Sequence, residues 1–275
     1  MKKTMYETPE IESNTIETLS AKLLEVTNLL SKSNEKLKKE QKEREEMLAN
    51  ISHDLRAPIT AIRSAIDYLT SGQELSKEDI NTSLQIIDRR TKTLENMILD
   101  MYYLFSVEDT SKELCFESID AAVFLEEYFF DTIVDSRYNT HNMVLSLDPT
   151  LNCIIYIDVQ KMVRVLDNLF TNAVKYSQKG STITLKAYLS ENDNVTTKSL
   201  CIEIIDNGIG IPQKALPNIF NRTYTVSSAR TPNTATGTGL GLSIVKAIVE
   251  RHNGKIKCES KLDKGSAFII NLPCQ

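Results

Sequence analysis

The 275-residue sequence contains no tryptophan, few glycines and prolines, and no long uninterrupted apolar segment. A membrane-spanning helix needs about 20 consecutive apolar residues, so none is predicted here. The opening residues Met1-Lys2-Lys3 are followed by Thr4-Met5-Tyr6-Glu7 and not by the apolar core of a signal peptide. We therefore expect a cytoplasmic location and no membrane contact by this chain.

The five cysteines are dispersed and form no Cys-x-x-Cys pair, which argues against a disulfide framework or a zinc site. Cys153, Cys201 and Cys258 lie in apolar, strand-like segments, where a thiol acts as a small hydrophobic group. The formal net charge is −5 and no cluster of Lys and Arg occurs, so nucleic acid is not an expected partner. With 41% hydrophobic and 25% charged residues, the composition is that of a globular protein of about two domains.

The N-terminal third shows the period of long amphipathic helices. Positions in steps of three and four indicate the seam of a coiled coil, which polar Ser33, Glu40 and Arg44 interrupt and weaken. Its apolar positions are Ile16, Leu19, Leu23, Val26, Leu30, Leu37, Met47 and Ile51. Ser76 to Asp79 has the pattern of a capping box that opens a second helix, with apolar positions from Leu84 to Phe105. One hairpin cannot cover its own apolar stripe, so we expect a dimeric four-helix bundle with a coiled-coil extension. Packing of the seam on the C-terminal domain is the alternative.

Beyond residue 112, strand-like and helix-like stretches alternate, which predicts an α+β fold with helices on one face of a mixed sheet. The predicted helices cover 121–134, 159–176 and 243–250. The predicted strands cover 116–119, 143–147, 153–157, 183–188, 200–205, 255–260 and 267–272. The expected domains are an N-terminal tail and coiled coil at 1–47, a helical hairpin at 48–108 and a further domain at 112–275.

One histidine has neighbours suited to chemistry. In Ile51-Ser52-His53-Asp54-Leu55-Arg56-Ala57-Pro58-Ile59, His53 lies two residues past the seam and should face solvent. Asp54 can accept a hydrogen bond from Nδ1–H and leave Nε2 as a nucleophile. Pro58 should kink the helix just beyond. An ordinary polar residue on a solvated helix face is the alternative for His53.

Two asparagines and a lysine share one face of the predicted helix 159–176. Asn168, Asn172 and Lys175 are spaced by four and three residues. Asparagine is a poor former of helix interiors, so two on one stripe indicate a purpose beyond helix formation. An amide oxygen suits Mg²⁺, which prefers few protein ligands beside water and phosphate. A solvated face is again the alternative.

Two glycine motifs follow. Asp206-Asn207-Gly208-Ile209-Gly210 ends a predicted strand, and taken alone it is a hairpin-turn signal. Gly237-Thr238-Gly239-Leu240-Gly241 opens a helix, whose N-terminal N–H groups suit phosphate. A Rossmann dinucleotide loop requires a preceding strand, and the segment 227–235 is polar and loop-like, so that alternative fails.

These four motifs resemble, in order, the H, N, G1 and G2 boxes of bacterial sensor histidine kinases, and the resemblance extends from about Leu48 to Pro273. It implies a dimerising phosphoacceptor hairpin followed by an ATP-binding α/β sandwich of the Bergerat type. It also implies an ATP-dependent protein-histidine kinase that autophosphorylates and passes the phosphoryl group to an aspartate of a response regulator. The implied cofactors are ATP and Mg²⁺, and the implied partners are a second copy and a response regulator.

The same resemblance assigns roles to individual residues. His53 would be the phosphoacceptor and Asp54 its acid/base partner, while Asn168 would bind Mg²⁺. Asp206 would accept a hydrogen bond from the adenine amino group. The remaining nucleotide contacts would come from Asn172, Lys175, Tyr176, Gly208, Gly210, Gly237, Gly239, Leu240 and Gly241.

Some positions depart from the family pattern. Ala57 replaces the Thr or Asn that many relatives use for phosphatase activity. Thr223 and Thr225 replace a phenylalanine and an arginine, so Arg222 or Arg230 is expected to contact the γ-phosphate instead. Another ATPase of the same superfamily is one alternative, and the H box on a dimerising hairpin argues against it. A degenerate kinase that acts as a dimeric scaffold is the other, and the intact Asn168, Asp206 and glycine positions argue against it.

Overall fold

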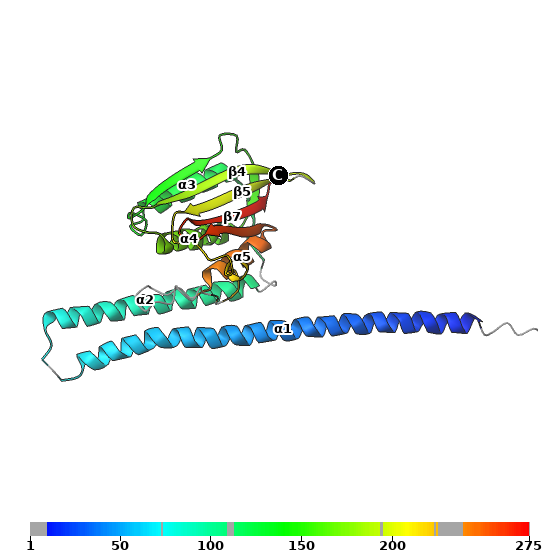
Figure 1. Cartoon of the computed structure of the whole chain (residues 1–275), viewed down its shortest axis with the longest axis horizontal. Helices are drawn as coiled ribbons and strands as arrows, with labels where there is room; N and C mark the ends of the chain where they lie inside the picture. Colours follow the sequence, from blue (N-terminus) through cyan, green and yellow to red (C-terminus); the bar gives the residue numbers. More distant parts are fainter. Residues whose placement is uncertain are drawn as a thin grey trace, which may run out of the picture. The chain divides into compact units, whose positions relative to one another are not determined.

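The computed structural model describes residues 10–72, 74–108, 113–192, 195–222, 224 and 239–274. The chain forms two compact units, residues 1–53 and 54–275. The predicted α+β class is confirmed, since two long helices precede a domain of mixed sheet and helices (Figure 1). In the described part of the chain, no helix is both long enough and apolar enough to cross a membrane.

The first helix, α1, runs over Glu10–Leu69 and continues through Pro58. Proline has no N–H, so Pro58 does not donate the usual helical hydrogen bond. Along the N-terminal part of α1 the seam leucines Leu19, Leu23 and Leu30 are 69%, 69% and 60% exposed. Within the part of the chain that the structure describes, no residue covers these seam leucines.

The second helix, α2, spans Lys77–Glu108 and begins at the predicted capping box. The hydroxyl of Ser76 accepts a hydrogen bond from the backbone N–H of Asp79 at 3.1 Å. In return, the Asp79 carboxylate accepts one from the backbone N–H of Ser76 at 3.2 Å. This reciprocal pair satisfies two N–H groups that the helix start leaves without helical partners, and it confirms the predicted capping box.

The remaining domain contains two sheets. Two short strands, β1 (Glu117–Asp120) and β3 (Ile154–Ile157), form an antiparallel pair. The main sheet has the order β2-β4-β5-β7-β6, with β2 and β4 parallel and every other pair antiparallel. Its strands are β2 (Asn142–Leu147), β4 (Thr182–Asn192), β5 (Val195–Asp206), β6 (Lys255–Lys261) and β7 (Gly265–Pro273).

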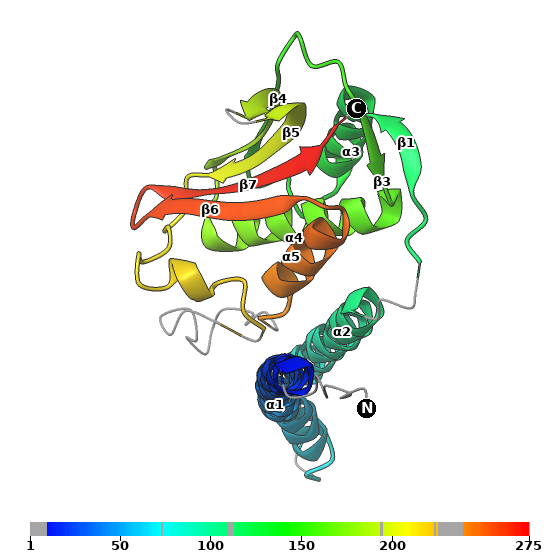
Figure 2. The ribbon, with the colours of Figure 1, turned by 90° about the vertical axis from the view of Figure 1, so that its right-hand side faces the viewer.

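Three helices lie on one side of the main sheet (Figure 2): α3 (Ala121–Val134), α4 (Val159–Tyr176) and α5 (Gly241–Arg251). The bounds of α3 and α4 are those predicted from the sequence. Both begin at an aspartate whose carboxylate accepts backbone N–H groups, Asp120 for α3 and Asp158 for α4. Placing helices on one face lets each bury its apolar side, as predicted.

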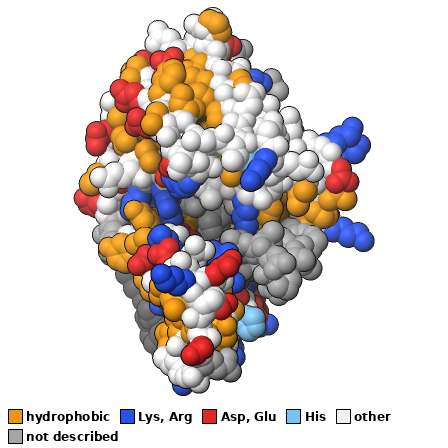
Figure 3. All heavy atoms as spheres, turned by 90° about the vertical axis from the view of Figure 1, so that its left-hand side faces the viewer, with side chains coloured by type: hydrophobic (Ala, Val, Ile, Leu, Met, Phe, Trp, Pro, Cys, Tyr) orange, Lys and Arg blue, Asp and Glu red, His pale blue; other side chains and the backbone are white. Residues whose placement is uncertain are grey.

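The core of this domain lies between α4 and the sheet. Helix α4 buries six residues on its inner face: Met162, Val165, Leu166, Leu169, Phe170 and Ala173. By contrast, Phe130 and Val134 on the outer face of α3 are 57% and 81% exposed. Figure 3 shows apolar side chains gathered on one face of the molecule, with acidic side chains beside them. Helix α4 therefore has a fully packed inner face and is free to present its other face to a cavity.

A buried histidine joins α5 to the start of α4. The ring of His252, at the C-terminal cap of α5, is 2% exposed. Its Nε2 accepts a hydrogen bond from the backbone N–H of Asp158 at 2.9 Å, and its Nδ1 donates to the Ile248 carbonyl at 2.8 Å. Burial lowers the pKa of His252 below its ordinary value. The sequence analysis placed no role on this residue, and its role here is to fix two helix ends.

Candidate nucleotide site

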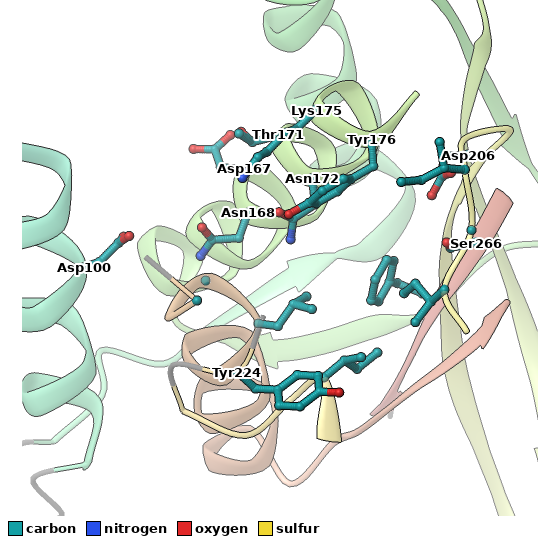
Figure 4. Close-up of a pocket in the computed structure, with 18 of the residues that line it drawn as sticks. Asp100, Asp167, Asn168, Thr171, Asn172, Lys175, Tyr176, Asp206, Tyr224 and Ser266 are labelled. Carbon is teal, nitrogen blue, oxygen red and sulfur yellow. The ribbon is translucent and has the colours of Figure 1, made fainter. Parts of the chain in front are cut away.

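A cavity of about 490 Å³ lies beside the exposed face of α4, lined by residues from the second unit of the chain. Four of the predicted site residues on α4 line it: Asn168, Asn172, Lys175 and Tyr176. Figure 4 shows these side chains along one side of the helix, with Asp206 beyond the Tyr176 end. The predicted stripe is therefore brought together with the predicted glycine motifs, because Gly210, Gly239 and Gly241 also line the cavity.

Asp206 closes one end of the cavity from the last position of β5. It is 5% exposed, and its Oδ1 accepts a hydrogen bond from the backbone N–H of Gly208 at 2.8 Å. Burial raises the pKa of Asp206 above its ordinary value, while hydrogen bonds from the backbone of Gly208 and Ser266 oppose the rise. Asp206 thus presents a buried carboxylate, which is a hydrogen-bond acceptor, to a ligand in the cavity.

The turn after Asp206 lies against the C-terminal end of α4. The backbone N–H of Ile209 donates to the Tyr176 carbonyl at 3.0 Å. A Cβ atom at Gly208 would lie 2.4 Å from that carbonyl oxygen, so no larger residue fits. Glycine at this position is therefore required by the close approach of two backbone segments. The contact fixes Asp206 relative to the α4 stripe.

Asn168 is the first residue of the stripe and lies beside the start of α5. Its Nδ2 is buried and has no hydrogen-bond partner among the described residues. A Cβ atom at Gly241, the first residue of α5, would lie 3.3 Å from Asn168 Oδ1. A buried amide without a partner is costly, so a polar ligand in the cavity would stabilise it.

The aromatic and cationic side chains at the Tyr176 end are also in contact. The Nζ atom of Lys175 lies 5.0 Å from the centroid of the Tyr176 ring, within cation–π distance. This contact holds the Lys175 ammonium at the cavity, where it can meet an anionic ligand.

The other predicted residues fall in different places. Leu240 is the N-cap residue of α5 and 1% exposed, so its side chain belongs to the core. Arg222 is half-buried and does not line the cavity. Gly237, Thr223, Thr225 and Arg230 lie outside the described residues. His53 is exposed and Asp54 half-buried on consecutive positions of α1.

The sequence analysis missed several residues that line the cavity, among them Arg164, Asp167 and Thr171 on α4, and Asp100 on α2. Arg164 lies four residues before Asn168, so extending the stripe by one helical turn would have identified it. Asp167 accepts a hydrogen bond from the hydroxyl of Tyr128 on α3 at 3.0 Å. No sequence pattern connects Asp100 with α4, because that contact is long-range.

Comparison with known proteins gives two family matches. Residues 157–275 match the family described as "Histidine kinase-, DNA gyrase B-, and HSP90-like ATPase". Residues 43–110 match the "His Kinase A (phospho-acceptor) domain". The cavity and the Asp206 turn lie chiefly in the first match, and His53 lies in the second.

The chain is also similar to individual proteins. The sensor protein kinase WalK of Staphylococcus saprophyticus is 34% identical over 235 residues, which are 86% of this chain and 37% of WalK. The chain thus spans little more than a third of that relative.

Two solved structures share its fold. Histidine kinase ThkA, in complex with response regulator protein TrrA, has a TM-score of 0.65 at 23% identity. The match covers 87% of this chain and 66% of the ThkA chain. Full-length ShkA in complex with AMPPNP has a TM-score of 0.56 at 21% identity. The match covers 83% of this chain and 46% of the ShkA chain.

Proposed function

Because this chain belongs to the bacterial two-component sensor histidine kinases, we propose that it transfers the γ-phosphoryl group of ATP to His53 and then to an aspartate of a response regulator. The observation that carries the proposal is the cavity, where a buried carboxylate lies beyond one end of a polar α4 stripe. Phosphoryl transfer requires chiefly positioning and charge neutralisation, which such a site provides.

The cavity has a place for each part of ATP. The adenine amino group would donate to Asp206, whose buried carboxylate favours a donor. The phosphates would lie toward Gly239, Leu240 and Gly241, where N–H groups at the start of α5 suit an anion. Asn172, Lys175 and Tyr176 would contact the nucleotide between these ends. ShkA, which shares this fold, was solved in complex with the nucleotide analogue AMPPNP, and this supports nucleotide binding as the proposal.

The residues present also fit Mg²⁺. The Asn168 side chain is the candidate to hold it, because its amide oxygen suits this hard cation. Its buried Nδ2, which has no partner among the described residues, could then donate to a phosphate oxygen. When bound, Mg²⁺ would supply charge neutralisation on the phosphates. Asn168 would orient the phosphate end of the nucleotide, and the N–H groups at the start of α5 would hold its oxygens.

The acceptor half of the reaction rests on His53 and Asp54. The exposed His53 ring is open to an incoming phosphoryl group. Asp54 would accept the Nδ1 proton, so that the Nε2 lone pair forms the new N–P bond while the O–P bond to ADP breaks. Transfer to a response regulator is supported by the ThkA structure, which contains the regulator TrrA.

The second copy of the chain is a further part of the proposal. The exposed seam of α1 repeats in steps of three and four over Leu19, Leu23, Val26 and Leu30, which are 52–69% exposed. Such a stripe favours burial against an identical helix. The match to the phosphoacceptor domain at residues 43–110 supports the same bundle. We also propose domain bounds of 1–47, 48–108 and 112–275.

Incubation with γ-labelled ATP and Mg²⁺ tests this function. We expect covalent label that is lost in acid and retained in base, as for a phosphohistidine. Asp206→Asn should weaken ATP binding about 10- to 100-fold, because a charge-assisted hydrogen bond contributes about 1.5–3 kcal/mol. Asp148→Asn is the matched control, since its carboxylate is bonded to Thr150 outside the cavity. Acid-stable label, or equal ATP binding by both variants, would contradict the proposal.

A further inference from the structure

An ion pair joins helix α2 to the cavity. Arg164 on α4 donates from Nη2 to the Asp100 carboxylate on α2. Both residues line the cavity, and their side chains are only 29% and 13% exposed. Figure 4 shows Asp100 projecting from α2 toward the part of α4 that carries Asn168. The pair is therefore partly shielded from solvent, which distinguishes it from an ordinary surface ion pair.

The pair belongs to a larger contact between α2 and the ATPase domain. Tyr103, one turn beyond Asp100, has Lys161 Nζ at 4.8 Å and Arg164 Cζ at 5.2 Å from its ring centroid. One further turn along, the Val107 carbonyl accepts a hydrogen bond from Arg251 Nη1 at 3.2 Å. Three successive turns of α2 thus hold cations from α4 and α5.

Arg164 also extends the nucleotide stripe. It lies one turn before Asn168 and twelve residues before Tyr176, which is about 18 Å along the helix axis. With adenine at Asp206, beside the Tyr176 end, the phosphates of a bound nucleotide would extend along α4 toward Asn168 and Arg164. A guanidinium binds carboxylates and phosphates with the same N–H donors, so a phosphate at Arg164 would compete with Asp100 for Nη2.

Two other cationic side chains that line the cavity also make contacts within the protein. Arg137 donates from Nε to the Asp135 carboxylate at 2.7 Å, and Lys175 lies over the Tyr176 ring. Asp100 and Asp167 add negative charge to the cavity lining. A polyphosphate near Asn168 would thus meet the Asp100 carboxylate at Arg164 unless Asp100 moved away from that guanidinium.

We propose that Arg164 is a phosphate-binding residue of the nucleotide site, and that Asp100 on α2 competes with the phosphates for it. This inference rests on the proposed function, since it requires ATP in the cavity. Binding of ATP would release α2 from α4, and by reciprocity any change that weakens the α2 contact would strengthen ATP binding. The contact would thereby couple nucleotide binding to the position of the phosphoacceptor helices.

Calorimetry on the full chain with Mg²⁺ and, separately, adenosine, ADP and ATP tests the proposal. Asp100→Asn should raise ATP affinity at least about fivefold, at the low end of allosteric couplings, and leave adenosine affinity unchanged. Arg164→Gln should lower ATP affinity at least about tenfold, again without an effect on adenosine, because adenosine lacks phosphate. The matched control is Asp88→Asn, an exposed aspartate of α2 paired with Lys92 at 2.8 Å, which should change none of the three affinities.

The double variant Asp100→Asn/Arg164→Gln sharpens the test. Without Arg164 there is nothing to compete for, so the gain from Asp100→Asn should be much smaller than in the wild-type background. Equal ATP affinities for Asp100→Asn and Asp88→Asn, or wild-type ATP affinity in a folded Arg164→Gln variant, would overturn the competition. Failure of the wild-type chain to bind either adenosine or ATP would instead refute the proposed nucleotide site itself.

Discussion

Leucines have opposite environments in the two long-helix regions of this molecule. On α1, Leu19 and Leu23 are each 69% exposed, whereas on α4, Leu166 and Leu169 are fully buried. Both helices repeat their apolar residues with helical spacing, so the pattern alone does not decide the environment. Helix α4 buries its stripe against a sheet of the same chain, and we propose that α1 buries its stripe against a second copy. The same residue type should therefore stabilise the fold in one region and the assembly in the other.

The largest effect is expected in the ATPase core. Leu169→Ala should reduce the free energy of unfolding by about 2–5 kcal/mol, because it removes buried methyl groups and leaves a cavity. Denaturant unfolding followed by circular dichroism measures the loss. Leu262→Ala is the control, since Leu262 is 55% exposed. Equal losses for the two variants would contradict the packing described for α4.

Substitutions in the α1 seam should weaken association of two copies of the chain rather than folding of one copy. Leu23→Lys places a charge on the seam and should weaken the proposed dimer at least about tenfold, which corresponds to about 1.4 kcal/mol. Leu24→Lys is a matched control, because Leu24 is adjacent, 65% exposed and off the seam. Sedimentation over a range of concentrations distinguishes the two. A wild-type monomer at tens of micromolar, where weak association is still detected, would refute the bundle.

A smaller effect concerns pH and the ATPase domain. The neutral ring of His252 accepts the Asp158 N–H, and burial lowers its pKa, so the unfolded chain binds the proton more readily. This stabilisation is present above the ordinary histidine pKa of about 6.5 and is lost as the pH falls below it. We expect acidification to lower the unfolding midpoint temperature of the wild type more than that of His252→Gln. The control His141→Gln should show the same dependence of unfolding temperature on pH as the wild type. The same dependence in His252→Gln would contradict the role given to His252.

The sequence predicted the locally determined parts of this structure. The bounds of α3 and α4 follow from an aspartate cap and an amphipathic period, both of which are local signals. The pairing of β1 with β3 could not be predicted, because strand partners are far apart in the chain. The contact of Asp100 with Arg164 escaped for the same reason. The buried position of His252 was also missed, since a lone histidine at a helix end carries no sign of the backbone groups it will meet.

The smallest change is expected at Ala57, four residues after His53 on α1. Alanine has no group that orients a water molecule, so we predict little phosphatase activity toward a phosphorylated response regulator. Ala57→Thr should raise that activity partially and leave phosphorylation of the chain nearly unchanged. The decay rate of phosphorylated regulator, with ADP and either variant, measures the difference. Rapid decay with the wild-type chain would show that another residue orients the water.

The most direct test of the division between acceptor helix and ATPase domain is to locate the phosphate. The chain contains only three histidines, so peptide mapping by mass spectrometry at neutral or basic pH, after incubation with ATP and Mg²⁺, can separate them. We predict phosphate on His53 and none on His141 or His252. His53→Gln should abolish incorporation while ATP affinity stays at the wild-type value. Phosphate on another residue, or continued acid-labile incorporation in His53→Gln, would contradict the account.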